Sequence, residues 1–440
     1  MGATGLAVTG ASARRLGERV RSGEITSTEV VELHLGRIAE VNAAVNAVVQ
    51  LDAERALADA AAADDALSRG RLLGDLHGVP FTVKDNLETA GIVTAIGIPE
   101  RARHVPHSDA TVVARLRAAG AILLGKTNCP PWGAGGVTDN PVYGRTNNPY
   151  DLERTPGGSS GGEAAIIAGG GSPCGLGSDS GGSLRQPAHF CGIACLKPTA
   201  GLVPLTGLVD DDGPVGAIGD PRTQVGPLAR FVDDLGLVLR AIAGHGRREP
   251  DVPPVIVGDS ATVELSRLRA VVESENDVVA PSAETRRAVE AAVGALRDAG
   301  VTVEERTLPS GGHDLTREIW KSYGGRMRSD ELYVVLRRWD AYRRRMLEFM
   351  DGYELMVTPV FDVPAPRHQE ATSPDFGRGV AYTTPFSLTG WPAAVVRAGS
   401  SEQGLPIGVQ IVARPWHDHV ALAAAGRVEE ALGGWQSPPI

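Results

Sequence analysis

The segment from Thr155 to Thr199 reads TPGGSSGGEAAIIAGGGSPCGLGSDSGGSLRQPAHFCGIACLKPT and is rich in glycine and serine. Glycine has no Cβ atom, so the backbone of such a segment can approach a ligand closely. Gly181 and Gly182 stand directly before Ser183, where backbone N–H groups can be aimed at a developing negative charge. This stretch therefore indicates a site built largely from backbone groups.

Two short matches point to other kinds of site. The segment Gly120 to Thr127, GAILLGKT, fits the G-x-x-x-x-G-K-[ST] pattern of a phosphate-binding loop, which lies between a strand and a helix. Here the pattern follows a predicted helix, its middle residues are apolar, and Pro130 and Pro131 oppose a helix directly after it. A nucleotide-binding protein using this segment is therefore kept only as an alternative of another class.

The GGSSGG segment, Gly157 to Gly162, also fits the G-x-S-x-G pattern of the nucleophile elbow in α/β-hydrolases. That elbow directly follows a strand, whereas the stretch from Pro149 to Pro156 is polar and bounded by prolines. The local context therefore does not favour an α/β-hydrolase.

Three motifs in combination are more specific than either match. They are VKDN at residues 83–86, GGSSGG at 157–162 and SDSGGSLR at 178–185. With the late segment GLPIGVQIV at 404–412, they make the chain similar over essentially its full length to the amidase signature family. Fatty acid amide hydrolase, peptide amidases and the catalytic subunit of glutamyl-tRNA amidotransferase belong to that family.

The resemblance implies a fold of the α/β class. The expected architecture is a single amidase signature domain over residues 1–440, with a large twisted mixed β-sheet sandwiched by helices (α/β/α). The signature core is expected at about 75–230, and a variable substrate-lining region at about 310–390. The pattern of elements agrees, since a helix over Asp109 to Ala119 precedes an apolar strand over Ala121 to Leu124.

Carried over residue by residue, the resemblance makes Lys84 the base, Ser159 the relay serine in a cis peptide, and Ser183 the nucleophile. A serine hydroxyl is a weak nucleophile and needs a base within hydrogen-bond reach. Lysine can be that base only when neutral, and moving its pKa toward 7 costs about 4 to 5 kcal/mol. Burial of Lys84 on a short strand suits that demand.

The resemblance also names residues around this triad. Oxyanion donors are expected from the backbone N–H groups of Ser180, Gly181, Gly182 and Ser183. Substrate contact is expected at Gly133, and supporting roles at Asp179, Arg185 and Ser160. For Asp179 and Arg185 a structural ion pair is equally open. Position 180 is Ser where the family commonly has Thr or an apolar residue, which leaves the N–H group intact.

These residues predict an amide hydrolase that forms an acyl-enzyme on Ser183 and releases ammonia or an amine. No cofactor is expected, because acyl transfer needs only a nucleophile, a base and oxyanion donors. The alternative within the family is an ammonia-supplying subunit of a glutamyl-tRNA amidotransferase-like complex. The natural amide, esterase side activity and a homodimeric state are left open.

The resemblance implies a small-molecule amide as the partner, and composition argues against nucleic acid and a membrane. The formal charge is −10 at pH 7 without a long Lys/Arg block, which argues against nucleic acid. No apolar run long enough for a membrane span and no signal peptide are present, so a cytoplasmic protein is expected. The spacing of the four cysteines favours neither disulfides nor a metal site, and predicts small, reduced, buried side chains. They are Cys129, Cys174, Cys191 and Cys195.

Overall fold

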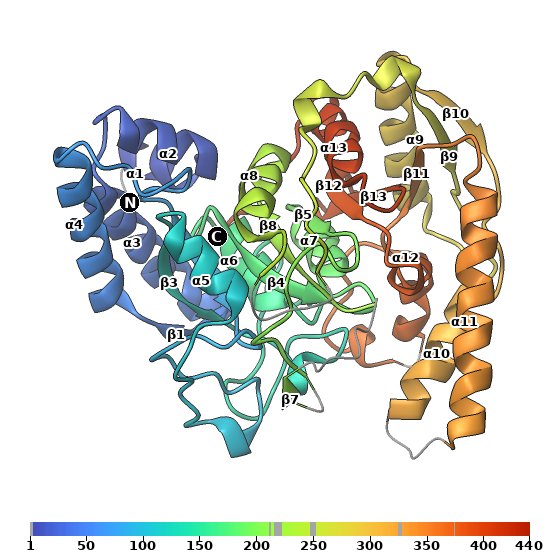
Figure 1. The fold of residues 1–440 in the computed structure, drawn as a ribbon, viewed down its shortest axis with the longest axis horizontal. Coiled ribbons are helices and arrows are strands. Elements are labelled where there is room, and N and C mark those ends of the chain that lie inside the picture. The colour runs from blue at the N-terminus through green and yellow to red at the C-terminus, as the bar shows by residue number, and fades with distance from the viewer. Residues whose placement is uncertain (1–2, 211–212, 215–221, 247–251, 324–327, 374) are drawn as a thin grey trace.

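An eleven-stranded mixed sheet runs through the molecule (Figure 1). The computed structural model describes residues 3–210, 213–214, 222–246, 252–323, 328–373 and 375–440. Within these residues the strand order is β1-β3-β2-β4-β8-β5-β12-β13-β11-β9-β10. The strands are β1 Val48–Leu51, β2 Pro80–Lys84, β3 Ile122–Thr127, β4 Cys174–Asp179, β5 Ala194–Lys197, β8 Gln224–Ala229, β9 Arg269–Val272, β10 Thr302–Glu305, β11 Leu355–Pro359, β12 Ala393–Ser400 and β13 Pro406–Ala413. A separate two-stranded ribbon joins β6 Val209–Asp210 to β7 Gly213–Pro214.

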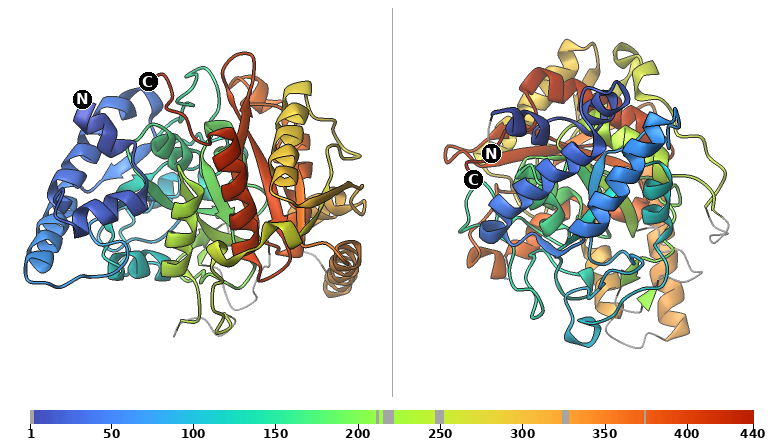
Figure 2. Two further views of the ribbon diagram at one scale, coloured as in Figure 1. Left: turned by 90° about the horizontal axis from the view of Figure 1, so that it is seen from above. Right: turned by 90° about the vertical axis from the view of Figure 1, so that its left-hand side faces the viewer.

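Helices cover both faces of this sheet (Figure 2). They are α1 Ala3–Thr9, α2 Ala13–Arg21, α3 Ser27–Val45, α4 Ala53–Ser68, α5 Thr111–Ala118, α6 Gly161–Ala168, α7 Arg185–Cys191, α8 Val232–Ile242, α9 Ala283–Asp298, α10 Gly312–Tyr323, α11 Ser329–Phe349, α12 Thr384–Thr389 and α13 Asp418–Leu432. The N-terminal helices and α11 lie at opposite ends of the molecule (Figure 1). None of the described helices is long and apolar enough to cross a bilayer.

Alternate residues of single strands enter different hydrophobic cores. On β11, Val357 belongs to the core under α5, α8, α9 and α13, whereas Met356 belongs to the core under α10, α11 and α12. On β3, Leu123 joins the first of these cores, and Leu124 packs with α3, α4, α6 and α7. Since neighbouring side chains of a strand point to opposite faces, the sheet is the middle layer of three. The predicted α/β/α architecture is confirmed.

The strand directions explain where functional groups gather. Strand β2 pairs in parallel with both β3 and β4, while β4 pairs antiparallel with β8. Lys84 is the last residue of β2, and Asp179 is the last residue of β4. Parallel neighbours end at the same edge of a sheet, so the VKDN and SDSGGSLR motifs leave the sheet side by side. Helix α6 begins with the second half of GGSSGG beside them.

The GAILLGKT segment forms a buried strand and contains no phosphate-binding loop. Gly120 ends the turn after α5 with a φ of +88°, and residues from Ile122 to Thr127 form β3, which pairs with β1 and β2. Lys126 is fully buried and donates to the hydroxyls of Thr89 and Thr94 at 3.1 Å each, and to the Leu87 carbonyl. Its backbone and ammonium groups are thus used internally, and the nucleotide-binding alternative is wrong.

The start of α3 and the four cysteines also follow local sequence patterns. Thr26 and Glu29 form a capping box at the start of α3, with each side chain bonded to the backbone N–H of the other. All four cysteines are buried and free, as their spacing predicts. The Arg-rich stretch after Leu315 belongs to two helices, α10 and α11.

Candidate active site

The predicted base, Lys84, is completely buried at the end of β2. Its neighbours Phe81 and Val83 point into the hydrophobic core on one face of the sheet. Lys84 shares the other face with Thr82, which bonds to α6. The Lys84 Nζ atom is hydrogen-bonded to Ser159 Oγ at 2.6 Å and to Ser178 Oγ at 2.9 Å. The ammonium side chain therefore reaches the predicted relay serine directly.

A second pair of residues near Lys84 is absent from the predicted site. Ser178 Oγ accepts hydrogen bonds from Lys84 Nζ and from Asn86 Nδ2, each at 2.9 Å. A neutral lysine amine has two hydrogens and one lone pair, so a hydrogen given to Ser178 leaves the lone pair for Ser159. Ser178 and Asn86 both stand inside the quoted motifs, and the signal that pairs them is the parallel register of β2 and β4.

Burial lowers the pKa of Lys84 to about 8, and the negative charges of the Asp179 and Glu163 carboxylates limit the shift. Glu163 on α6 accepts hydrogen bonds from the hydroxyls of Thr82 and, at 2.6 Å, Thr127. Burial raises the pKa of Glu163 to about 7, and these hydrogen bonds oppose the rise. A lysine with this pKa carries a substantial neutral fraction near neutral pH.

Ser159 lies in a loop that contacts the Gly135 loop and the loop of Ser183. The peptide bond between Gly158 and Ser159 is cis. A Cβ atom on Gly158 would lie 2.6 Å from the Gly135 carbonyl oxygen, so only glycine fits there. The Ser160 N–H group donates to the Ser183 carbonyl at 3.1 Å, which holds the relay loop against the nucleophile loop. The Ser160 hydroxyl donates to the Ser178 carbonyl at 3.3 Å.

Ser183 lies in the loop between β4 and α7 and is partly exposed, whereas Lys84 and Ser159 are buried. Its hydroxyl has no hydrogen-bond partner among the described residues, so the contact from Ser183 Oγ to Ser159 is not made in this structure. Catalytic hydrogen bonds are often long without substrate and tighten when it binds. Ser183 is therefore the partly exposed member of the predicted triad.

The backbone around Ser183 differs from the prediction at one donor. The N–H groups of Ser180, Gly181 and Ser183 have no acceptor in the described part of the chain. The Gly182 N–H group instead donates to Asp179 Oδ1 at 2.7 Å. Asp179 lies at the end of β4, and its carboxylate accepts hydrogen bonds from backbone N–H groups of the following turn. Of the four N–H groups predicted as oxyanion donors, the one of Gly182 is therefore already used within the protein.

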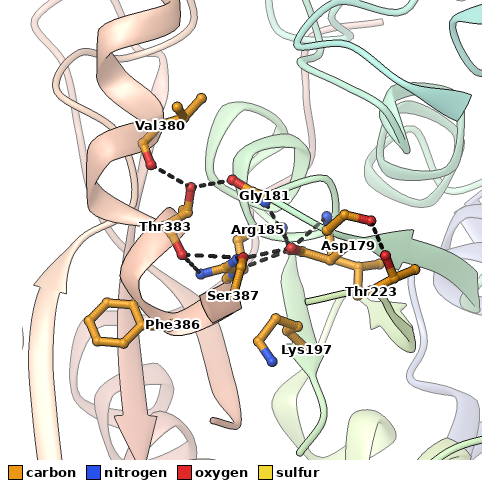
Figure 3. A network of polar contacts seen from close by, with 12 residues as sticks. Asp179, Gly181, Arg185, Lys197, Thr223, Val380, Thr383, Phe386 and Ser387 are labelled. Carbon is orange, nitrogen blue, oxygen red and sulfur yellow. Dashed lines mark hydrogen bonds and ion pairs between the residues drawn. The ribbon is translucent and has the colours of Figure 1, made fainter. Parts of the chain in front are cut away.

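Asp179 and Arg185 form a buried, two-pronged ion pair beneath this loop (Figure 3). Arg185 Nε lies 2.9 Å from Oδ2 and Nη2 lies 2.9 Å from Oδ1, and both side chains are fully buried. Burial alone would raise the pKa of Asp179, but the charge and hydrogen bonds of Arg185 hold it below its usual value. Arg185 also donates to the Thr383 carbonyl at 2.8 Å and to Ser387 Oγ at 2.9 Å.

The predicted substrate-contact residue Gly133 lies beside Asn86. A Cβ atom on Gly133 would be 3.0 Å from Asn86 Nδ2, and its φ of +68° favours glycine. Trp132 next to it has a φ of +59° and an exposed side chain. A Cβ atom on Gly136 would meet the ring of Phe376 at 2.7 Å. The loop thus contacts both the VKDN motif and the predicted substrate-lining region.

The chain is similar in sequence to known proteins over most of its length. A family model described as amidase matches residues 29–323 and 325–422. A glutamyl-tRNA(Gln) amidotransferase subunit of Roseiflexus sp. (strain RS-1) is 34% identical over a 482-residue alignment that covers 96% of each chain.

Solved structures resemble the chain over almost its whole length. A bacterial aryl acylamidase of the amidase signature family gives a TM-score of 0.85 at 25% identity, covering 96% of each chain. A 6-aminohexanoate cyclic dimer hydrolase with bound substrate gives 0.83 at 27% identity, covering 98% of each. A glutamyl-tRNA(Gln) amidotransferase subunit of Thermotoga maritima gives 0.77 with 26% identity, covering 94% of each.

Proposed function

The chain belongs to the amidase signature family of enzymes, and from this premise we propose that it hydrolyses a small aryl or alkyl amide through an acyl-enzyme on Ser183. The observation that carries this proposal is the 2.6 Å contact between the buried Lys84 Nζ and Ser159 Oγ. The loop of Ser159 is hydrogen-bonded to the loop of the partly exposed Ser183. Burial makes lysine a base near neutral pH, and the second serine extends its reach.

In the proposed first step, Ser183 Oγ bonds to the amide carbonyl carbon while its proton passes to Ser159 and the proton of Ser159 passes to Lys84. The carbonyl oxygen becomes an oxyanion that faces the free backbone N–H groups of Ser180, Gly181 and Ser183. Each such donor is worth about 3 to 4 kcal/mol in a preorganised site. The C–N bond then breaks, and the same relay returns the proton to the departing nitrogen.

Water completes the reaction by attacking the ester that links the acyl group to Ser183. Lys84 again takes a proton, now from water through Ser159, and gives it back to Ser183 Oγ as the acid leaves. The products are a carboxylic acid and ammonia or an amine, and the enzyme is returned unchanged. The hydrogen bond from Lys84 to Ser178 keeps the lone pair of the amine directed at the relay in both halves of the cycle.

The direct test is hydrolysis of a panel of primary and anilide amides with aryl and alkyl acyl groups, followed by release of ammonia or of the amine. We expect turnover of at least one member by the purified chain alone. A matched ester of each acid belongs in the panel, because the same acyl-enzyme accepts an alcohol leaving group. Failure to turn over any amide, with a folded protein, would contradict the proposal.

The rate should depend on pH through Lys84. Because the base must be neutral, and the neutral fraction grows as the pH rises through a pKa of about 8, kcat/KM is expected to rise about tenfold per pH unit below about pH 7. It should level off above about pH 9. Cys129, Asp179 and Glu163 face Lys84, and any titration of Glu163 would add a shallower step.

The pH profile needs a parallel melting curve to separate ionisation of Lys84 from loss of the fold. A profile that is flat between about pH 6 and pH 9 while the melting temperature is unchanged would exclude Lys84 as the base in the rate-limiting step.

A second candidate function is supply of ammonia to a partner-bound substrate. The identity of 34% to the Roseiflexus amidotransferase protein over 96% of each chain favours it. The similarity of the folds favours the first candidate, amide hydrolysis. The aryl acylamidase gives a TM-score of 0.85, whereas the Thermotoga maritima amidotransferase protein gives 0.77 at a similar sequence identity. Glutaminase activity together with copurifying subunits would support the ammonia-supply function. Turnover of a simple amide by the isolated chain would support the first candidate, amide hydrolysis.

A further inference from the structure

The peptide unit between Gly181 and Gly182 is held at both of its polar ends (Figure 3). Its carbonyl oxygen accepts a hydrogen bond from Thr383 Oγ1 at 2.6 Å. Its N–H group donates to Asp179 Oδ1 at 2.7 Å. One peptide plane in the middle of the nucleophile loop is thus clamped between a threonine hydroxyl and a carboxylate.

The two groups that hold this peptide are themselves joined by Arg185. Its guanidinium group donates to both oxygens of Asp179 at 2.9 Å and to the Thr383 carbonyl at 2.8 Å. Arg185, Asp179 and Thr383 are all fully buried. Water therefore cannot replace these contacts easily, and the spacing between the carboxylate and the threonine is fixed by one rigid, planar group.

The threonine hydroxyl has a single hydrogen and two neighbouring carbonyl oxygens. Gly181 O lies at 2.6 Å, and Val380 O, three residues back in the chain, lies at 3.0 Å. The shorter distance favours donation to Gly181. Close packing agrees, because a Cβ atom on Gly182 would lie 2.6 Å from Thr383 Oγ1. The contact is thus directed at the nucleophile loop rather than at the local turn.

A glycine pair needs such a clamp. Gly182 has a φ of +129°, and a Gly-Gly segment has more accessible backbone conformations than any other pair. The orientation of its peptide plane sets the direction of the neighbouring N–H groups of Gly181 and Ser183, which carry the proposed oxyanion hole. Donors aimed before the reaction begins cost no reorganisation in the transition state.

We propose that Thr383 is a positioning residue that keeps the Gly181–Gly182 peptide in its catalytic orientation, an inference that rests on the proposed function of Ser183. Thr383 follows the 3-10 turn Phe376–Tyr382 and precedes α12, inside the predicted substrate-lining region. The segment that lines the substrate is therefore bonded directly to the loop that stabilises the oxyanion.

The test compares three variants that differ in one hydroxyl group. Thr383→Val removes the hydroxyl with little change in shape, and Thr383→Ser retains it. Thr384→Val is the matched control, because Thr384 is equally buried, follows Thr383 directly, and has a hydroxyl without a hydrogen-bond partner in this structure. Melting temperatures of all three show whether any variant has lost its fold.

The expected result is a kcat for Thr383→Val that is about 10- to 100-fold below that of the parent, with KM changed by less than about threefold. Thr383→Ser should recover most of the rate, and Thr384→Val should match the parent. Affinity for a trifluoromethyl ketone analogue of the substrate, which forms an oxyanion on Ser183, should fall in Thr383→Val by about the same factor as kcat/KM.

Parent-like kcat in Thr383→Val, or equal losses in Thr383→Val and Thr384→Val, would overturn the positioning role while leaving the proposed hydrolysis intact. A loss confined to KM would overturn it as well, since a misaimed oxyanion hole acts on kcat. A parent chain that hydrolyses no amide and does not react with the ketone would overturn the proposed function, and the positioning role with it.

Discussion

A Ser183→Ala variant is expected to lose amide hydrolysis by a factor of about 10⁴ or more, because no acyl-enzyme can form without the hydroxyl group. The side chain is partly exposed and makes no hydrogen bond within the described residues, so its removal should leave the fold unchanged. The measurement is kcat/KM on the best amide of the panel, together with the melting temperature.

Ser160→Ala is the informative comparison for this variant. Ser160 is the other serine of GGSSGG, and its buried hydroxyl donates to the Ser178 carbonyl at 3.3 Å rather than facing an open site. The Ser160→Ala variant should therefore lose far less activity than Ser183→Ala. If Ser183→Ala kept more than about a hundredth of the parent rate and Ser160→Ala lost all of it, the nucleophile would have to be reassigned.

Replacing Lys84 with methionine is expected to lower kcat by about 10³-fold or more. Methionine fills a similar volume, but it offers no lone pair to receive the proton that Ser183 gives up through Ser159. The residual rate should also lose the rise with pH that is expected of the parent. Both kcat and the melting temperature of the purified variant are measured, because replacing a buried titratable side chain can also change the stability of the fold.

Lys126→Met provides the matched control. Lys126 is one strand away on β3, is equally buried, and has its pKa lowered to about 8 by the same cause, burial. Its Nζ atom contacts threonine hydroxyls and the Leu87 carbonyl instead of a serine near the nucleophile. Folded Lys126→Met should keep its specific activity. Equal losses in the two variants would mean that Lys84 acts through stability and not as a base.

These two lysines show why a shifted pKa does not identify a catalytic group by itself. Lys84 and Lys126 have similar burial and similar pKa values, and only their partners differ. The sequence separates them because Lys84 stands in VKDN and resembles the family base, whereas Lys126 stands in a pattern whose local context contradicts a phosphate loop.

The site residues predicted from the Thr155 to Thr199 segment lie in the loops and helices next to β4. Lys84 and the SDSGGSLR motif are brought together because β2 and β4 are parallel neighbours whose ends meet. The layer order also follows from the alternating helix and strand pattern. Their catalytic roles remain predictions that the variants above test.

Contacts between distant segments were not predictable from the sequence. Thr383 reaches Gly181 across about two hundred residues, and nothing in the local pattern of residues 376–389 signals that contact. The Gly182 N–H group was expected in the oxyanion hole, but the strand end brings Asp179 within 2.7 Å of it. Such details depend on the orientation of single peptide planes, which residue types alone do not specify.

The central claim is that Lys84 activates Ser183 through Ser159. Its most direct test is the intact mass of the protein after exposure to a fluorophosphonate probe, measured as a time course for the parent, Ser183→Ala and Lys84→Met. The account predicts one adduct on the parent, none on Ser183→Ala, and a much slower one on Lys84→Met. An adduct that forms on Ser183→Ala at the parent rate would contradict the account.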